Sequence, residues 1–294
     1  MTRTPRWLQQ LAAAGMLAVG AAGPTHSAVV YSLADFGESL IRFDSANPGV
    51  VTTIGAVSGA TTRLDGMDFR PADGQLYGFN QATSGIYRID LATGTTHLVS
   101  TSTAPSDLSD VLGIDFNPVP DRLRLVNAAG QNLRINVATG AALVDGTLAY
   151  AAGDANAGTA PFIVDAAYTN HDRDPLTGTT LYYIDSELDI LATTSAPNAG
   201  MLTTVGLLGF DVDAQTGFDI YTEGGANTAY ASFRVGGRQG FYTINLATGA
   251  ATRLGDVGAE NLYGLAVAPV AEPGALALLG AAGLAAAAVR RRRR

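Results

Sequence analysis

The chain has 294 residues, 47% of them hydrophobic, and no cysteine. Without cysteine it has no disulfide bond, thiolate nucleophile, iron–sulfur cluster or cysteine-ligated zinc. Between residues 29 and 270 it has 11 Arg, no Lys and 25 Asp or Glu, a net charge of −14, which disfavours nucleic acid as a partner and favours cations or basic surfaces.

Residues 1–28 are predicted to be a secretory signal peptide that signal peptidase removes. Arg3 and Arg6 give a basic start, residues 8–23 are apolar and rich in alanine, and small residues follow up to Ala28. A membrane anchor is the alternative, but the apolar run is short for a span and contains two glutamines.

A strand-and-turn motif then recurs along the chain. Its copies read RFDSANPG, RIDLATG, RINVATG, YIDSELD and TINLATG, with their Asp or Asn at Asp44, Asp90, Asn136, Asp185 and Asn245. Apolar side chains alternate before each Asp or Asn, which predicts a strand, and the Asx residue followed by glycine is typical of a hairpin turn. The steps of 46 to 60 residues indicate propeller blades or solenoid units.

The two ends of this region predict a closed ring. Residues 66–71 and 113–118 are predicted first strands, and residues 264–269 match their pattern with no blade after them. Residues 29–33 match a second strand with no first strand before it. If these ends pair, residues 29–269 form one all-β domain, a five-bladed β-propeller of four-stranded antiparallel blades. Six blades are the alternative, because the last 60-residue step has room for a hairpin around residues 206–213.

Residues 270–294 have a different character from the body. Glu272 and Pro273 precede sixteen small or apolar residues, and the chain ends in a basic cluster made of Arg290, Arg291, Arg292, Arg293 and Arg294. A sixteen-residue helix is about 24 Å long, which is marginal for a hydrocarbon core of about 30 Å, and the arginines would stay on the cytoplasmic side. A plain tail anchor is one interpretation of this transmembrane helix.

This Glu-Pro dipeptide, short apolar helix and arginine cluster resemble the PEP-CTERM sorting signal of Gram-negative bacteria, with Ala271 where that family has its first proline. The resemblance implies an exosortase substrate. Such a protein is anchored transiently in the inner membrane and then reaches the cell surface or an extracellular matrix.

The body carries LYGF, GIDFNP, DRLRLV, GQNLRIN, AAYTN and NTAYA in this order. These motifs resemble the bacterial domain-of-unknown-function family 4394. The resemblance implies propeller-like repeats and brings no activity or catalytic residue with it.

Three aspartates share one position of the predicted first strands. They are Asp68, Asp115 and Asp219, and Tyr168 and Ala266 are predicted at the equivalent places of the other two blades. The innermost strands of a propeller line its channel, so these carboxylates are candidate ligands of a hard cation such as Ca²⁺. The alternative is that each carboxylate accepts backbone N–H groups of an adjacent blade.

A second candidate site lies on two adjacent predicted strands. Arg122, Arg124, Arg134 and Asn132 could bind a carboxylate or a sulfated sugar, because guanidinium groups bind such anions in a bidentate way. An internal network with the many carboxylates explains the same residues.

The predicted function is that of an exported, non-enzymatic propeller of the cell surface or extracellular matrix that binds an unidentified ligand or partner. Exopolysaccharide and another surface protein are the candidate partners, and the membrane is contacted only through the tail. The body has only His97 and His171 and no HExxH, GxSxG or P-loop string. The alternatives are a cation-dependent hydrolase or lyase acting on extracellular polysaccharide or a lactone, and a structural matrix protein.

Overall fold

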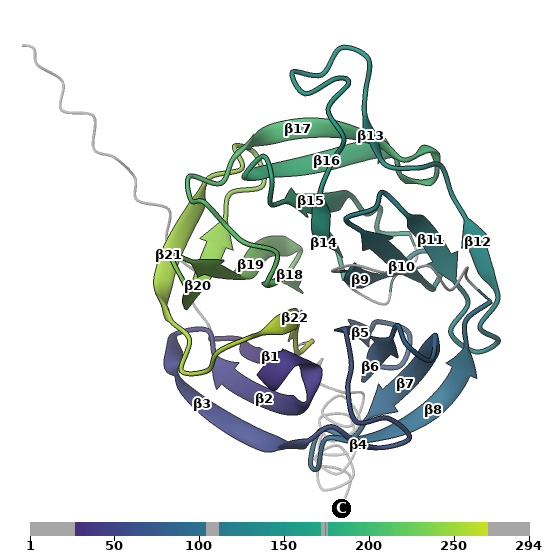
Figure 1. Cartoon of the computed structure of the whole chain (residues 1–294), viewed down its shortest axis with the longest axis vertical. Helices are drawn as coiled ribbons and strands as arrows, with labels where there is room; N and C mark the ends of the chain where they lie inside the picture. Colours follow the sequence, from purple (N-terminus) through teal and green to yellow (C-terminus); the bar gives the residue numbers. More distant parts are fainter. Residues whose placement is uncertain (1–26, 104–111, 172–173, 175, 270–294) are drawn as a thin grey trace, which may run out of the picture.

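The computed structural model describes residues 27–103, 112–171, 174 and 176–269. Residues 1–26 of the predicted signal peptide and the predicted sorting tail, residues 270–294, lie outside the described residues. Five small sheets surround a central axis (Figure 1). The predicted all-β, five-bladed propeller is therefore confirmed, and the six-blade alternative is wrong.

Four strands of each blade run antiparallel, and they follow one another outward from the central axis of the ring, the region that is called the channel below (Figure 1). Blade 1 comprises β22 (Tyr263–Val267), β1 (Val29–Ala34), β2 (Ser39–Asp44) and β3 (Asn47–Ala56). Blade 2 comprises β5 (Gly66–Arg70), β6 (Gln75–Asn80), β7 (Gly85–Ile89) and β8 (Thr95–Thr101), with the short parallel β4 (Ser58–Gly59) at its rim. Blade 3 comprises β9 (Leu112–Asn117), β10 (Arg122–Asn127), β11 (Asn132–Ile135) and β12 (Ala142–Val144).

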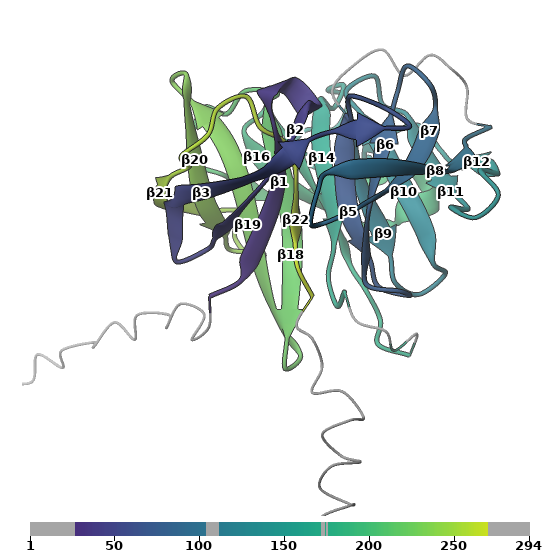
Figure 2. The ribbon, with the colours of Figure 1, turned by 90° about the horizontal axis from the view of Figure 1, so that it is seen from below.

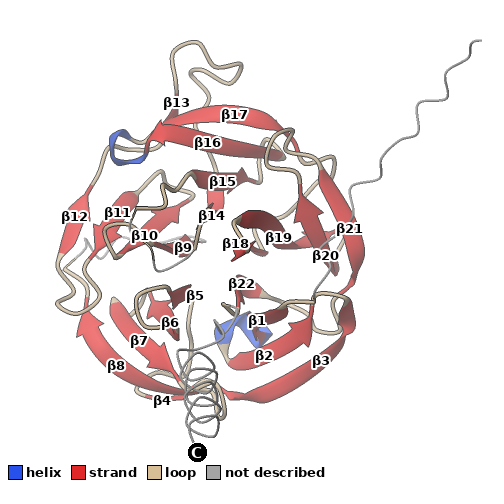
Figure 3. Cartoon of the chain, turned by 180° about the vertical axis from the view of Figure 1, so that it is seen from behind, coloured by secondary structure: helices blue, strands red, loops and turns tan. Residues whose placement is uncertain are grey.

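Blade 4 comprises β14 (Ile163–Tyr168), β15 (Leu181–Asp185), β16 (Ile190–Ala196) and β17 (Met201–Leu207), with the short parallel β13 (Ala149–Tyr150) at its rim. Blade 5 comprises β18 (Thr216–Glu223), β19 (Ala226–Val235), β20 (Arg238–Ile244) and β21 (Ala251–Asp256). Helical structure in the described ranges consists of two 3₁₀ turns, η1 (Asp35–Gly37) and η2 (Pro197–Ala199) (Figure 3). No helix within these ranges is long and apolar enough to cross a membrane.

The ring closes where the last strand of the body joins the first. β22 pairs antiparallel with β1, with Val267 opposite Val30 and Ala266 opposite Tyr31. The two strands lie side by side in both the axial and the side view (Figures 1 and 2). This pairing confirms the predicted closure and leaves no open end between blade 1 and blade 5.

The recurring Asx-to-glycine turn has two structural roles. In the turn between β7 and β8, Asp90 Oδ1 accepts hydrogen bonds from Ala92 N and Thr93 N, at 2.8 and 3.0 Å. The glycine that ends the same turn in blade 3, Gly140, has φ +72°, and a Cβ there would lie 1.9 Å from Thr101 O of blade 2. Only glycine fits both this backbone conformation and this close contact between neighbouring blades.

The fourth copy of the motif does not have the place that the sequence pattern predicts. Asp185 ends β15, the second strand of its blade, whereas the other copies end third strands. In blade 4, η2 and Gly200 join the third strand to the fourth.

Apolar side chains from neighbouring blades pack together between the sheets. Phe43 of blade 1 meets Phe241 of blade 5 edge to face at 5.1 Å, and Tyr77 of blade 2 meets Phe116 of blade 3 at 5.6 Å. Each such pair contributes about 0.5–1.5 kcal/mol beyond the burial of its area. In a chain without cysteine, this packing and the strand pairing hold the inner strands in fixed positions around the channel.

Candidate functional site

Four of the five innermost strands place a buried aspartate beside the central channel. Asp68 lies on β5, Asp115 on β9, Asp165 on β14 and Asp219 on β18, and each is at most 3% exposed. In blade 1, β22 has Ala266 instead. Asp165 was not predicted, because the sequence pattern placed Tyr168 at the blade 4 position.

Three of these carboxylates connect adjacent blades through backbone hydrogen bonds. Asp68 Oδ2 accepts from Phe116 N at 2.8 Å, Asp165 Oδ2 accepts from Phe218 N at 2.8 Å, and Asp219 Oδ2 accepts from Val267 N at 2.6 Å. The other oxygen of each accepts from the next residue of its own strand, at 2.6 to 2.9 Å. These contacts are the interblade hydrogen bonds that were the alternative to cation binding.

The carboxylate of Asp115 accepts fewer hydrogen bonds than the other three. Its Oδ1 accepts from Tyr168 N of blade 4 at 3.2 Å. Within the described part of the chain, this is the single hydrogen bond that its carboxylate makes. A carboxylate that is 1% exposed therefore has an oxygen without a protein donor.

Three of these four buried carboxyl groups have a raised pKa. Burial is the main cause for each, because a buried carboxylate loses its hydration. It raises the pKa of Asp115 and Asp165 well above the usual range and the pKa of Asp219 to about 7. For Asp115, repulsion by the charges of Asp68 and Asp219 adds to this increase.

A loop from blade 4 brings His171 to these carboxylates. His171 follows β14, its backbone N donates to Thr222 Oγ1 at 3.1 Å, and its side chain is 7% exposed. Asn170 and His171 thereby lie against the β18–β19 hairpin, which extends beyond the ring on one face (Figure 2). His171 Nε2 lies 3.5 Å from Asp68 Oδ2.

Asp68, Asp115 and His171 each offer a ligand atom, and these atoms lie within 4.8 Å of one another. The structure thus brings together two of the three aspartates predicted as metal ligands. Asp219 is not in this group. Both of its oxygens accept backbone N–H groups, as do both oxygens of Asp68. His171 was not among the ligands predicted from the sequence.

The second candidate site divides into two parts. Arg124 is 1% exposed and donates to Tyr168 Oη at 3.1 Å, Asn132 Oδ1 at 2.7 Å, Asp145 Oδ2 at 2.6 Å and Asn198 Oδ1 at 3.0 Å. Arg134 binds both oxygens of Asp145, each at 2.8 Å. The carboxylate between these two guanidinium groups is therefore the protein's own.

Arg122 lies apart from that network. Its Nη1 donates to the backbone oxygens of Pro120 and Asp121, at 3.1 and 2.9 Å. Ligand binding by Arg122, Arg124, Arg134 and Asn132 stays a prediction.

The chain matches one protein family, described as Domain of unknown function (DUF4394), over residues 39–266. It belongs to this family. The DUF4394 chain has no match among curated proteins.

Among solved structures, the DUF4394 chain is similar to a chain described as "Crystal structure of Nidogen/Laminin Complex". The TM-score is 0.50 and the identity 10%, over 83% of this chain and 98% of that one. At this identity the similarity shows the fold alone.

Two further structures are similar at lower scores. One is a protein of unknown function from Bacteroides thetaiotaomicron, with TM-score 0.45 and 14% identity over 76% of this chain and 56% of that chain. The other is a protein from Lactobacillus plantarum, with TM-score 0.40 and 16% identity over 78% of this chain and 67% of that chain.

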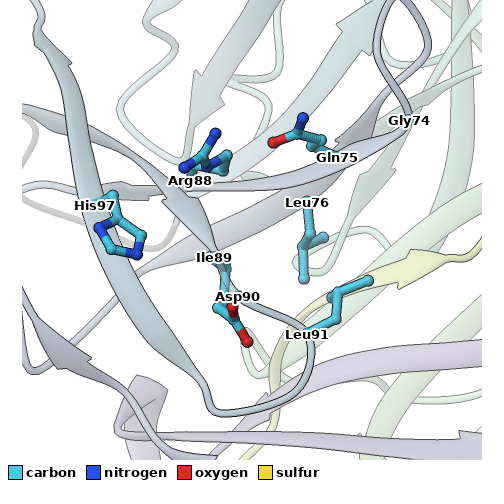
Figure 4. A pocket seen from close by; sticks show the side chains of 8 residues that line it. All are labelled: Gly74, Gln75, Leu76, Arg88, Ile89, Asp90, Leu91 and His97. Atoms are coloured by element: carbon cyan, nitrogen blue, oxygen red, sulfur yellow. The ribbon is translucent and has the colours of Figure 1, made fainter.

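The DUF4394 propeller also has a hollow of about 290 Å³ on the outer half of blade 2. Arg88 and His97, which are paired across β7 and β8, line it together with Gln75 and Asp90 (Figure 4). A second hollow, of about 380 Å³, lies between the loops of blades 3 and 4 beside Tyr150. Neither hollow is lined by the channel aspartates, so both are separate from the group at His171.

Proposed function

We propose that this DUF4394 protein is an exported, non-enzymatic propeller of the cell surface or extracellular matrix, and that it binds a basic protein partner beside Phe36. The signal-peptide pattern and the PEP-CTERM-like tail support export, and the absence of known catalytic strings supports a non-enzymatic role. The main evidence for a binding site beside Phe36 is the backbone conformation of this exposed residue.

Phe36 is an exposed aromatic residue in a backbone conformation that favours glycine. It lies in η1 between β1 and β2, with φ +58° and 48% exposure, and Asp35 before it has φ +53°. A left-handed conformation costs about 1–2 kcal/mol for a residue with a side chain. An exposed phenylalanine offers little burial to offset this cost, so fold stability alone does not explain it.

The surrounding contacts hold this turn in place. Phe36 N donates to Asn261 O at 3.3 Å, and Leu64 N donates to Gly37 O at 3.0 Å. The ring of Phe36 lies 6.2 Å from that of Tyr263. A fixed and exposed aromatic side chain is a common anchor at protein interfaces, because it contributes contact area with little loss of conformational freedom.

The charge around Phe36 indicates the chemistry of the partner. Asp35 and Glu38 flank it and are exposed, and the exposed Glu260 precedes the residue to which Phe36 N donates. The nearby Arg63 is paired with Asp65 at 3.0 Å. A partner rich in Arg or Lys would pair with these carboxylates and place a cation over the ring, whereas an acidic polymer would be repelled.

An arginine-rich peptide, with a glutamate-rich peptide of equal length as its control, tests this proposal by calorimetry. We expect the protein to bind the basic peptide and Phe36→Ser to weaken that binding at least about tenfold, which is about 1.4 kcal/mol. Val50→Ser is the matched control, because Val50 is a 64% exposed apolar residue on β3 of the same blade. The proposal is wrong if Phe36→Ser and Val50→Ser weaken binding of the basic peptide equally. It is also wrong if a neutral oligosaccharide, titrated in the same way, binds more tightly than the basic peptide.

Localisation is tested separately in a Gram-negative host that has an exosortase. We expect the chain to reach the surface without its tail, and replacement of Arg290–Arg294 by alanine to leave it unprocessed. The cation-dependent hydrolase or lyase stays an alternative, favoured by one observation, the grouping of Asp68, Asp115 and His171.

A further inference from the structure

Three side chains of metal-ligand type meet in the channel from three different blades. Asp68 comes from β5 of blade 2, Asp115 from β9 of blade 3, and His171 from the loop after β14 of blade 4. Their ligand atoms lie within 4.8 Å of one another, and both aspartates are 1% exposed. The group also differs from a set of carboxylates alone, because it includes an imidazole.

The hydrogen bonds of Asp115 indicate that this group takes a ligand. Asp68, Asp165 and Asp219 each accept backbone hydrogen bonds at both oxygens. Asp115, equally buried, accepts one at 3.2 Å, and no other described group donates to it. The second oxygen of Asp115 therefore has no described protein donor, and a bound cation would give it a partner.

The distance between His171 and Asp68 fits the same interpretation. At 3.5 Å, His171 Nε2 and Asp68 Oδ2 are farther apart than the 2.7–3.2 Å typical of an N–H···O hydrogen bond. Two ligands about 2.1 Å from one tetrahedral Zn²⁺ ion are about 3.4 Å apart. The observed separation is close to that value.

We propose that Asp68, Asp115 and His171 bind one divalent transition-metal ion, with Zn²⁺ as the representative, in the central channel. An imidazole nitrogen suits Zn²⁺ and similar metals, whereas Ca²⁺ takes oxygen ligands. This ligand set has His171 in place of the Asp219 predicted from the sequence. The proposal does not depend on the partner site at Phe36.

The position of His171 is set by protein contacts before any metal binds. Its backbone N donates to Thr222 Oγ1, and the preceding Asn170 exchanges two hydrogen bonds of 2.9 Å with Asn227. The backbone that carries the imidazole is thereby attached to the β18–β19 hairpin of blade 5. An ion bound to all three ligands would connect blades 2, 3 and 4, so its binding should stabilise the ring.

Calorimetric titration of the full-length protein with Zn²⁺, after EDTA treatment and without a polyhistidine tag, tests the proposal. We expect one Zn²⁺ per chain, a higher Tm with Zn²⁺, and no comparable effect of Ca²⁺ or Mg²⁺. His171→Ala and Asp115→Asn should each weaken Zn²⁺ binding at least about a hundredfold. His97→Ala should leave it unchanged, because His97 is exposed on the outer strand β8.

Four results would overturn the proposal. These are no Zn²⁺ binding by the wild-type protein, unchanged binding in His171→Ala, an equal loss in His97→Ala, and tighter binding of Ca²⁺ that does not depend on His171. The last result would support a carboxylate site of Asp68, Asp115 and Asp219 instead. If Asp115→Asn does not fold, the wild-type titration and His171→Gln still decide between these results.

Discussion

Asp219 Oδ2 on β18 accepts a hydrogen bond from the backbone N of Val267 on β22, over 2.6 Å. This contact joins blade 5 to the strand that completes blade 1, so it lies at the point where the ring closes. The equivalent contacts from Asp68 and Asp165 join other neighbouring blades. The channel aspartates therefore connect the blades in a protein that has no disulfide bond.

Asp219→Ala should destabilise the propeller. The substitution removes the acceptor for two buried N–H groups, those of Ile220 and Val267, and should lower the free energy of unfolding by about 2–4 kcal/mol. Urea unfolding at pH 7 measures the change. Asp219→Asn keeps one acceptor oxygen and should lower the free energy of unfolding by less. If Asp219→Ala is as stable as the wild type, Asp219 does not stabilise the contact between the blades.

Gly140→Ala should also destabilise the protein. Gly140 has φ +72°, and the added Cβ would lie 1.9 Å from Thr101 O, so blades 2 and 3 would have to separate or the turn would have to change. We expect a loss of about 2–4 kcal/mol, measured by thermal or urea unfolding. Gly153→Ala is the control, because a Cβ at this position has no neighbour within 4 Å. This substitution should change the free energy of unfolding by less than about 0.5 kcal/mol. A similar effect of both substitutions would contradict the close-contact argument.

Arg124→Ala should destabilise the protein strongly, and Arg122→Ala should change its stability little. Arg124 is 1% exposed and donates to Asp145, Asn132, Asn198 and Tyr168. Its removal leaves buried acceptors without a donor and should lower the free energy of unfolding by about 3–5 kcal/mol. Arg122 bonds backbone oxygens near the surface, so its loss should change stability by less than about 0.5 kcal/mol. Destabilisation by Arg122→Ala equal to that by Arg124→Ala would contradict this division.

The repeating strands and the ring closure were predictable because their signals are local. Alternating apolar residues indicate strands wherever they occur, and the unmatched strands at residues 29–33 and 264–269 have one simple solution, which is to pair with each other. The fourth copy of the motif shows the limit of this reasoning. Asp185 Oδ1 accepts from Glu187 N and Leu188 N, so it makes the same type of turn, but between the second and third strands. Turn chemistry does not say which two strands the turn connects.

Asp165 and His171 were harder to predict for different physical reasons. β14 has an irregular register between Ile163 and Asp165. Ile163 also takes the place, two residues before the aspartate, that glycine has in the other three aspartate-bearing first strands, so the first-strand pattern is altered in blade 4. His171 reaches Asp68, about a hundred residues earlier, because its backbone N donates to Thr222 in a hairpin of another blade. Contacts of this kind depend on how whole blades are arranged and leave no periodic signal in the sequence.

The raised pKa values of the channel carboxyl groups lead us to expect that the metal-free protein is more stable at mildly acidic pH than at pH 8. Burial raises the pKa of Asp219 to about 7 and that of Asp165 well above its usual range, while the unfolded value is about 3.9. The folded state therefore binds these protons more tightly. The resulting stabilisation is complete below about pH 4 and is lost as the pH rises through the folded pKa, which for Asp219 is about 7. In EDTA, we expect the Tm at pH 5 to exceed that at pH 8 by at least about 4 °C.

General repulsion within this acidic body acts in the same direction, so variants must separate the two causes. Asp165→Asn and Asp219→Asn each remove one buried titrating group and should reduce the difference in Tm between pH 5 and pH 8. Asp90→Asn removes an exposed carboxylate, whose pKa is lowered mainly by its hydrogen bond from Ala92 N, and should leave the difference nearly unchanged. If all three variants reduce the difference equally, general charge repulsion controls the pH dependence and the buried carboxyl groups do not.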